Sequence, residues 1–312
     1  MSKLDQTYLN FLAKPEFEDI LTNPILDIAA RFWDDERYDA FKVCYRSMRI
    51  IDDLVDDQKA SGHTLTQSEK KQLEHIITVW TEDFSKNKKT DEFQKALIDV
   101  KDKFQIPLWP WVRLSKAMIY DLYHNDFKSF LTFLRYSEGA AISPAAIFMH
   151  LIGVSKVDSL YTSPNYNIRY AARHLAVFSY LVHIMRDFQK DQLAGLNYYA
   201  LNQLEICSVT KIDLQIVAED EIVTANVRNL FSRYYGFASY YRTQARNTMN
   251  QILPLLAPRY QLSLEIIYSL YNQIFMKIDV QKGNFSESEL LPSKPEVKAL
   301  IDLTVEDFNK KS

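Results

Sequence analysis

The chain has 312 residues, of which 47% are hydrophobic and 13% aromatic, so it can bury a large core in one domain or two. Its formal net charge is -3 with both signs interspersed, and its one basic run, residues 86–89, is short, which argues against a nucleic-acid-binding protein. Two cysteines, Cys44 and Cys207, are too few for a disulfide framework or a cysteine-rich metal site, so we expect reduced thiols.

Turn content and hydrophobic periodicity predict an all-helical fold. The chain has only six glycines and ten prolines, fewer turn residues than strand-rich folds usually need. Apolar residues recur at helical spacing over most of the length, with breaks near residues 58–69, 104–111, 155–167 and 279–296. We therefore expect roughly ten helices in a single all-α domain that spans the whole chain.

The first strongly patterned helix has an apolar stripe at residues 41, 44, 48, 51 and 55, with an acidic run beside it. The run places four aspartates within six residues, at positions 52, 53, 56 and 57. Aspartate is a poor residue for a helix interior, and neighbouring carboxylates repel each other.

Tyr45, Arg49, Asp52 and Asp56 are spaced +4, +3 and +4, so they share one face of this helix. That face is turned by ~100° from the apolar stripe, and the carboxylates therefore border the core instead of lying opposite it. For this segment alone, a solvated acidic helix end explains the charge as well as a functional site does.

A second helix repeats the arrangement. Tyr180, His183, Asp187 and Asp191 are spaced +3, +4 and +4 beside an apolar stripe at residues 175, 178, 182 and 185, and we expect Gly195 to end this helix. Taken alone, the two aspartates also suit an ordinary exposed pair.

Two helices are expected nearer the C-terminus. Apolar positions 255, 260, 264, 267, 270 and 274 predict one of them, and residues 295–308 predict a closing helix with a polar face.

Together the two acidic helices indicate a metal site. If their faces meet across a cavity, several carboxylates converge, and two unit charges ~5 Å apart cost about 3 kcal/mol at an effective dielectric of 20. Such a site needs cations. Oxygen ligands without cysteine or clustered histidine suit Mg²⁺, which also favours phosphate oxygens, so we expect a diphosphate as the ligand.

Four blocks of the sequence resemble the squalene and phytoene synthase family. The stretches "YRSMRIIDDLVDD" and "HIMRDFQKDQLAGLNYY" are similar to its two aspartate motifs. Residues 117–141 resemble its M-x-x-D-L segment followed by a tyrosine, here Asp121 and Tyr136, and residues 240–274 resemble its C-terminal helices, with Tyr268 at the tyrosine position. The blocks occur in the family's order between Asp35 and Ile278.

The resemblance implies the isoprenoid synthase fold, a helical bundle with a central active-site cavity, and head-to-head joining of two prenyl diphosphates. It implies Mg²⁺–diphosphate ligands at Asp52, Asp56, Asp187 and Asp191. The residues that it implies in catalysis are Tyr45, Arg49, Tyr136, Arg186, Tyr198 and Tyr268. Those expected at the bound substrate are Tyr45, Arg49, Asp121, Tyr180, His183, Arg186, Lys190 and Tyr198.

The sequence departs from the family pattern around the second motif. His183 stands where the family usually has asparagine, Lys190 where it has glutamate, and Leu196 where it commonly has arginine. The N-terminal serine-phenylalanine segment has no clear counterpart in residues 23–33. Lys190 and His183 make this cluster less anionic, which should weaken Mg²⁺ binding, and Lys190 is a candidate to contact phosphate directly.

The leading hypothesis is a Mg²⁺-dependent prenyltransferase that condenses two farnesyl or geranylgeranyl diphosphates. The alternatives are a terpene cyclase or atypical prenyltransferase acting on one diphosphate, and a diverged relative without catalysis. The sequence does not indicate NADPH and leaves its use open. Without a secretory signal or a window of ~20 apolar residues, we expect a cytoplasmic protein with no membrane span; peripheral membrane contact for product release and the oligomeric state stay open.

Overall fold

The computed structural model describes residues 25–60, 65–220 and 222–311, with the side chains of residues 56–60 and 311 outside the described part. The first half contains α3 (Ile25–Ala30), α4 (Asp35–Ala60), α5 (Gln67–Ser85), α6 (Glu92–Lys103), α7 (Trp109–Tyr123), α8 (Phe130–Ala140) and α9 (Ile142–Gly153). After β1 (Ser155–Val157) and β2 (Leu160–Thr162) come α10 (Ile168–Arg186), α11 (Phe188–Leu193), α12 (Leu201–Ile206), α13 (Lys211–Asp220), α14 (Ala225–Ile252), the 3₁₀ turn η1 (Leu253–Leu255), α15 (Pro258–Lys277), α16 (Glu287–Leu290) and α17 (Lys294–Lys311).

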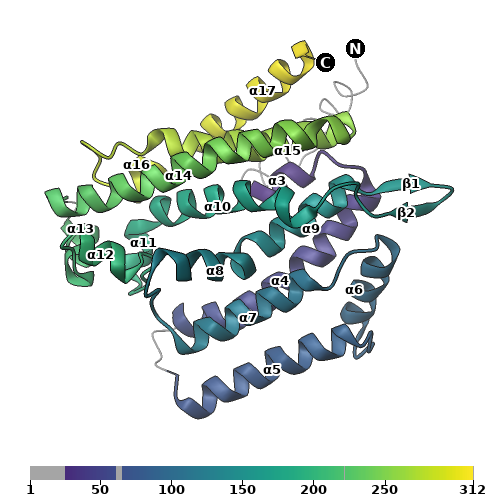
Figure 1. Ribbon diagram of the computed structural model, residues 1–312, viewed down its shortest axis with the longest axis horizontal. Helices are drawn as coiled ribbons and strands as arrows, with labels where there is room; N and C mark the ends of the chain where they lie inside the picture. Colours follow the sequence, from purple (N-terminus) through teal and green to yellow (C-terminus); the bar gives the residue numbers. More distant parts are fainter. Residues whose placement is uncertain (1–24, 61–64, 221, 312) are drawn as a thin grey trace.

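The helices stack in layers (Figure 1). Helix α5 lies outermost on one side and packs on α7, which packs on α4 and α8; α10 then packs on α9, α14 and α15, and α17 covers α15. The layers enclose a continuous core of buried side chains that extends from Ile28 to Val305. A core of this extent is what a single all-α domain requires.

Local sequence signals set several helix boundaries. Thr66 and Glu69 form a reciprocal capping box at the start of α5, and the Asn167 side chain accepts a hydrogen bond from the Tyr170 backbone at the start of α10. Gly195 has φ +73° just after α11, a left-handed conformation that glycine adopts without steric cost. The prediction that Gly195 ends this helical segment is therefore confirmed.

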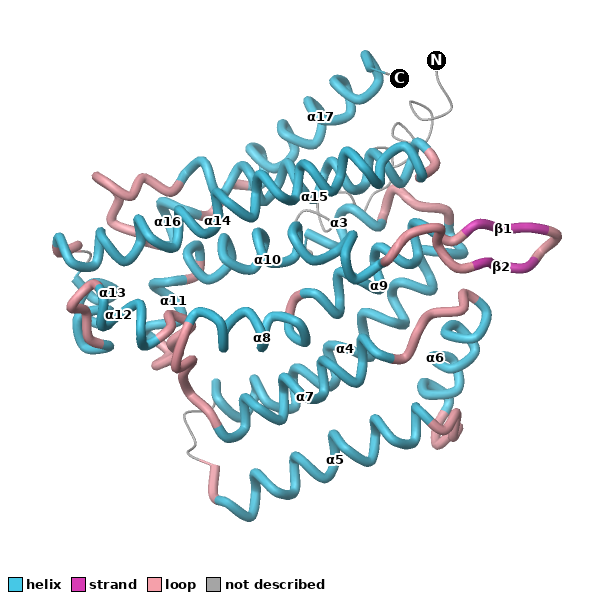
Figure 2. The backbone as a smooth tube through the Cα atoms, in the orientation of Figure 1, coloured by secondary structure: helices cyan, strands magenta, loops and turns pink. Residues whose placement is uncertain are grey.

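The all-helical prediction is confirmed, but the described residues contain fifteen α-helices where roughly ten were expected, and two further details differ. The break predicted at residues 155–167 contains a β-hairpin, β1–β2, whose turn at Asp158 and Ser159 has positive φ angles (Figure 2). The second acidic segment is also not one unbroken helix, because α10 ends at Arg186 and α11 starts at Phe188. The predicted C-terminal helices correspond to α15 and α17.

The direction of α4 and α10 positions the two acidic segments. Both helices run the same way through the bundle, so the ends that carry Asp52 and Asp187 lie toward the same end of the molecule (Figure 1). Asp187 is the C-cap of α10, so the negative end of that helix dipole lies beside it and adds to the need for positive charge. In the part of the chain that the structure describes, no helix combines the length and apolar composition needed to cross a bilayer.

A buried hydrogen bond joins α4 to α7 and supplies a test of the packing. The Trp111 Nε1 donates to Ser47 Oγ at 2.8 Å, and Ser47 Oγ donates to the Cys44 carbonyl one turn back at 2.6 Å, with Ser47 and Trp111 both fully buried. We predict that Ser47→Ala lowers the free energy of unfolding by about 1–3 kcal/mol, because the indole N–H loses its acceptor in the core. Urea unfolding would measure this.

Ser85→Ala on α5 is a matched control. Ser85 Oγ likewise donates to a carbonyl one turn back, that of Thr81 at 2.7 Å, but it is exposed and accepts no tryptophan N–H. Equal destabilisation by the two substitutions would contradict the assigned role of the Trp111 bond.

Candidate active site

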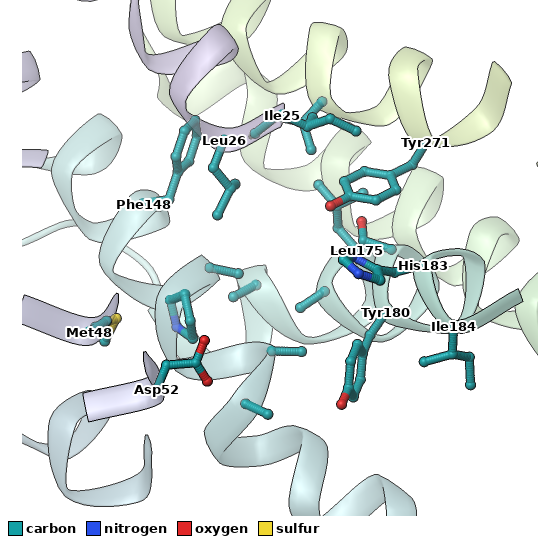
Figure 3. A pocket seen from close by; sticks show the side chains of 18 of the residues that line it. Ile25, Leu26, Met48, Asp52, Phe148, Leu175, Tyr180, His183, Ile184 and Tyr271 are labelled. Atoms are coloured by element: carbon teal, nitrogen blue, oxygen red, sulfur yellow. The ribbon is translucent and has the colours of Figure 1, made fainter. Parts of the chain in front are cut away.

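A cavity of about 540 Å³ opens between α4, α9, α10, α11 and α15. Its apolar walls include Leu26 from α3, Phe148 from α9, Leu175 from α10 and Leu264 from α15. In Figure 3 Leu26 and Phe148 lie at one end of this space, and Asp52, Tyr180 and Tyr271 reach into it from other sides. The volume is within the range of small-molecule sites.

Ionic side chains gather on the α4 and α10–α11 walls of this cavity. Its lining contains Arg49 and Asp52 from α4, and His183, Asp187, Lys190 and Asp191 from α10, α11 and the junction between them. The two acidic segments therefore border the same hollow. The Asp56 side chain lies outside the described residues, so its predicted position stays a prediction.

Asp187 sits at the junction of α10 and α11 and is held by two basic neighbours. Arg186 donates from Nε to Oδ1 at 2.5 Å and from Nη2 to Oδ2 at 2.7 Å, and His183 Nε2 lies 2.8 Å from Oδ2. Burial raises the pKa of the Asp187 carboxyl, but these hydrogen bonds outweigh it and hold the pKa below the ordinary range. The Asp187 side chain is only 14% exposed.

The first cluster is more open. Arg49 Nη1 donates to Asp52 Oδ2 at 2.6 Å, and the same guanidinium also pairs with Asp53. The Arg49 side chain is 46% exposed. Exposed ion pairs contribute little net stability, so these pairs can be exchanged for contacts with a ligand at low cost.

Tyrosines line much of the remaining polar surface. Tyr45, Tyr136, Tyr180, Tyr198 and Tyr271 all border the cavity. Burial raises the pKa of Tyr45, Tyr136 and Tyr180, and raises that of Tyr271 to about 12. These phenols therefore stay neutral near pH 7 and present ring faces and hydroxyl dipoles to the cavity.

Comparisons with known proteins identify the family. The sequence model of the squalene/phytoene synthase family matches residues 27–297. The chain belongs to the squalene/phytoene synthase family. Members of this family are prenyltransferases, and membership supports head-to-head condensation of prenyl diphosphates in general.

Two solved structures share the all-α fold of the isoprenoid synthase type. One is a dehydrosqualene synthase in complex with ligand, with a TM-score of 0.70, 16% identity and 99% of each chain covered. The other is the squalene synthase HpnC from Alicyclobacillus acidocaldarius, with a TM-score of 0.63, 15% identity and coverage of 88% of this chain and 91% of that one. A comparison with curated protein sequences gave no match.

Two residues expected at the substrate of this squalene/phytoene synthase homologue, Asp121 and Arg186, do not line the cavity, and neither does Tyr268, which was expected in catalysis. Asp121 on α7 is buried behind Tyr136, whose hydroxyl donates to it at 2.7 Å. Arg186 reaches the site through its bonds to Asp187. Asp121 and Arg186 are therefore placed to orient lining residues.

Tyr268 lies on α15 outside the cavity lining. It packs against Phe178, and the Arg246 guanidinium lies 4.0 Å from its ring centroid. Leu264, Ile267 and Tyr271 share the face of α15 that lines the cavity, and Tyr268, ~100° from Ile267, lies at the edge of that face on the side of Leu264.

Sequence reasoning also missed lining residues. Tyr271 follows Leu264 and Ile267 at helical spacing, and that pattern could have singled it out as a candidate. Ile25 and Leu26 from α3 cover the apolar end, in the segment for which no family counterpart was found. Their role depends on how α3 packs, which residue spacing does not give.

The donor chemistry suits Mg²⁺. Asp52, Asp187 and Asp191 offer carboxylate oxygens from two helical edges of one cavity, without cysteine ligands. Within the described ranges no three His, Cys, Asp or Glu side chains are gathered closely enough to hold an ion by themselves. A phosphate ligand would complete the coordination shell of such a donor set, because Mg²⁺ in proteins usually takes only one or two carboxylates.

The Asp187 pairing predicts a pH-dependent contribution to stability. Its folded-state pKa is depressed, so the contribution is present above the unfolded pKa near 4 and is lost as the pH falls below it. In metal-free buffer, Asp187→Asn should lower the free energy of unfolding by about 2 kcal/mol at pH 7. Urea unfolding between pH 3 and 7 should show the difference from the parent shrinking below pH 4.

Asp39→Asn supplies the control on α4. Asp39 is 67% exposed and pairs with Lys42 on the surface, so its substitution should have little effect at any pH in this range. If the destabilisation caused by Asp187→Asn does not change with pH, the ion pairs of Asp187 do not explain its contribution to stability.

Proposed function

We propose that this protein catalyses the Mg²⁺-dependent head-to-head condensation of two allylic prenyl diphosphates, farnesyl or geranylgeranyl, with release of diphosphate. One observation carries the proposal: a single cavity has apolar walls suited to prenyl chains and carboxylates from two acidic helix edges suited to a metal diphosphate. Family membership supports the reaction class.

The ionic end is assigned to the diphosphate. Mg²⁺ would be held by Asp52 and Asp56 of α4 and by Asp187 and Asp191 of the α10–α11 junction. Bound Mg²⁺ supplies the positive charge that stabilises the leaving diphosphate. Arg49 can exchange its surface pairs for hydrogen bonds to phosphate oxygens. These contacts favour the transition state, in which negative charge builds up on the leaving group.

The apolar walls and tyrosines are assigned to the carbocation. When the allylic C–O bond breaks, its electron pair leaves with the diphosphate and an allylic cation remains. The double bond of the second substrate attacks this cation, and loss of a proton gives a cyclopropylcarbinyl diphosphate. The ring faces of Tyr45, Tyr136 and Tyr180 stabilise positive charge, and side chains such as Phe148 and Leu175 exclude water that would quench it.

The test is incubation of the purified protein with farnesyl or geranylgeranyl diphosphate and MgCl₂, with and without NADPH, followed by analysis of the extracted lipids. We expect a linear hydrocarbon or its cyclopropylcarbinyl diphosphate precursor, built from two prenyl units, and no product in EDTA. A dependence of the final product on NADPH would establish its use as reductant. A cyclic product built from one prenyl unit would instead identify a terpene cyclase.

Asp52→Asn tests the metal assignment on α4. We predict at least a hundredfold loss of turnover, because a neutral amide cannot balance Mg²⁺ charge at the leaving group. Asp39→Asn, an exposed substitution on the same helix outside the cavity lining, should retain parental turnover. Parental turnover in Asp52→Asn would remove this residue from the metal site.

A pair of tyrosine substitutions on α15 tests which face of that helix meets the substrate. Tyr271→Phe should lower turnover by about fivefold, the equivalent of one hydrogen bond of about 1 kcal/mol, because its hydroxyl lies at the cavity surface. Tyr268→Phe keeps the ring beneath Arg246 and should change turnover by less than about twofold. The reverse order of effects, measured by steady-state kinetics, would contradict the assigned helical face.

A further inference from the structure

The two acidic edges of the cavity differ in how their negative charge is balanced. Between residues 49 and 57, α4 carries four aspartates and one arginine, so four minus one leaves three negative charges. Between residues 186 and 191, two aspartates accompany Arg186 and Lys190, and the formal charges cancel. The α4 edge therefore carries an excess of negative charge, whereas the α10–α11 edge already contains its own cations.

The oxygens of Asp187 are largely occupied. A carboxylate offers about four lone-pair positions, and three contacts from Arg186 and His183 use most of them on this side chain. The Arg186 side chain is only 18% exposed, so replacing its bidentate contact by a metal ion would leave a largely buried guanidinium without its partner. The Arg49 pairs on α4 are much more exposed and cost less to replace.

Lys190 is the available cation at this edge. It lies on α11 between Asp187 and Asp191, lines the cavity and is exposed. Its ammonium makes no hydrogen bond or ion pair with any residue among those described, although two aspartates are near it in sequence. A lysine at a cavity rim with three free N–H donors is suited to phosphate oxygens.

We propose that Lys190, supported by the Arg186–Asp187–His183 cluster, takes the place of a metal ion at the α10–α11 edge and contacts the diphosphate directly, so that the Mg²⁺ ions are held mainly by the α4 aspartates. This inference rests on the proposed function in taking a diphosphate as the ligand. It goes further in dividing the diphosphate between a metal-dependent α4 edge and a metal-independent α10–α11 edge, and it thereby narrows the four Mg²⁺ ligands given above mainly to the α4 aspartates. Arg186 acts as a positioning residue, because it does not line the cavity and reaches the ligand only through Asp187, whereas His183 both contacts Asp187 and lines the cavity.

Binding of inorganic diphosphate, measured by calorimetry with EDTA and separately with MgCl₂, tests the division without any turnover. Lys190→Gln should weaken binding by about tenfold in both conditions, because a charge-assisted hydrogen bond is lost whether or not metal is present. Asp52→Asn should weaken binding only with MgCl₂. Because Lys190 is exposed, its substitution should not impair folding, and thermal unfolding of the variant checks this.

Lys190→Glu provides a second readout. A carboxylate at this position recreates an acidic edge that needs a metal ion. The apparent diphosphate affinity should therefore rise more steeply with Mg²⁺ concentration than in the parent, because about one additional Mg²⁺ ion is taken up with each diphosphate. Lys116→Gln removes an exposed lysine on α7 outside the cavity lining and should match the parent in every measurement.

The outcomes separate this inference from the proposed function. If Lys190→Gln binds diphosphate as the parent does in both conditions, the inference is wrong, even when the parent converts prenyl diphosphates. If its affinity falls only with MgCl₂, Lys190 acts through the metal ions and the inference is also wrong. A parent that turns over no prenyl diphosphate but shows the expected Lys190 pattern contradicts the proposed reaction and retains the divided site.

Discussion

Electrostatic repulsion between carboxylates at one end of an apolar cavity is the constraint on which this structure depends. The α4 edge and the α10–α11 edge both bring aspartates to the same hollow, where the C-terminal dipole end of α10 adds negative potential. In a low-dielectric setting such an arrangement is stable only with compensating cations. Part of the compensation comes from Arg49, Arg186 and Lys190, and bound Mg²⁺ would supply the rest.

The apolar part of the cavity is formed by hydrophobic packing and not by charge. Leu26, Phe148, Leu175 and Leu264 come from four helices that meet only in the folded chain, and they leave a space of about 540 Å³ beside a densely packed core. Hydrophobic burial holds these helices together, and the cavity costs some of that stability. A hollow that joins apolar walls to a charged end suits an amphiphilic ligand with a lipid tail and a diphosphate head.

Relatives with the same fold need not balance charge in the same way. The two solved structures similar to this chain are only 15–16% identical to it, so the fold survives extensive replacement of side chains. At the α10–α11 edge this chain combines His183, Arg186 and Lys190 with Asp187, and three of the four contact one another. Because the fold fixes where charges meet but not how they are compensated, local differences of this kind can alter metal dependence without altering architecture.

The sequence by itself determined the all-α class, the family, and the shared face of Tyr45, Arg49 and Asp52, because helical periodicity follows directly from residue spacing. Only the tertiary structure decided that Tyr271 and not Tyr268 faces the cavity, that Asp121 lies behind Tyr136, and that α3 covers the apolar end. These features depend on the rotation of each helix against its neighbours. Side-chain packing sets that rotation, and it involves residues that are distant in the sequence.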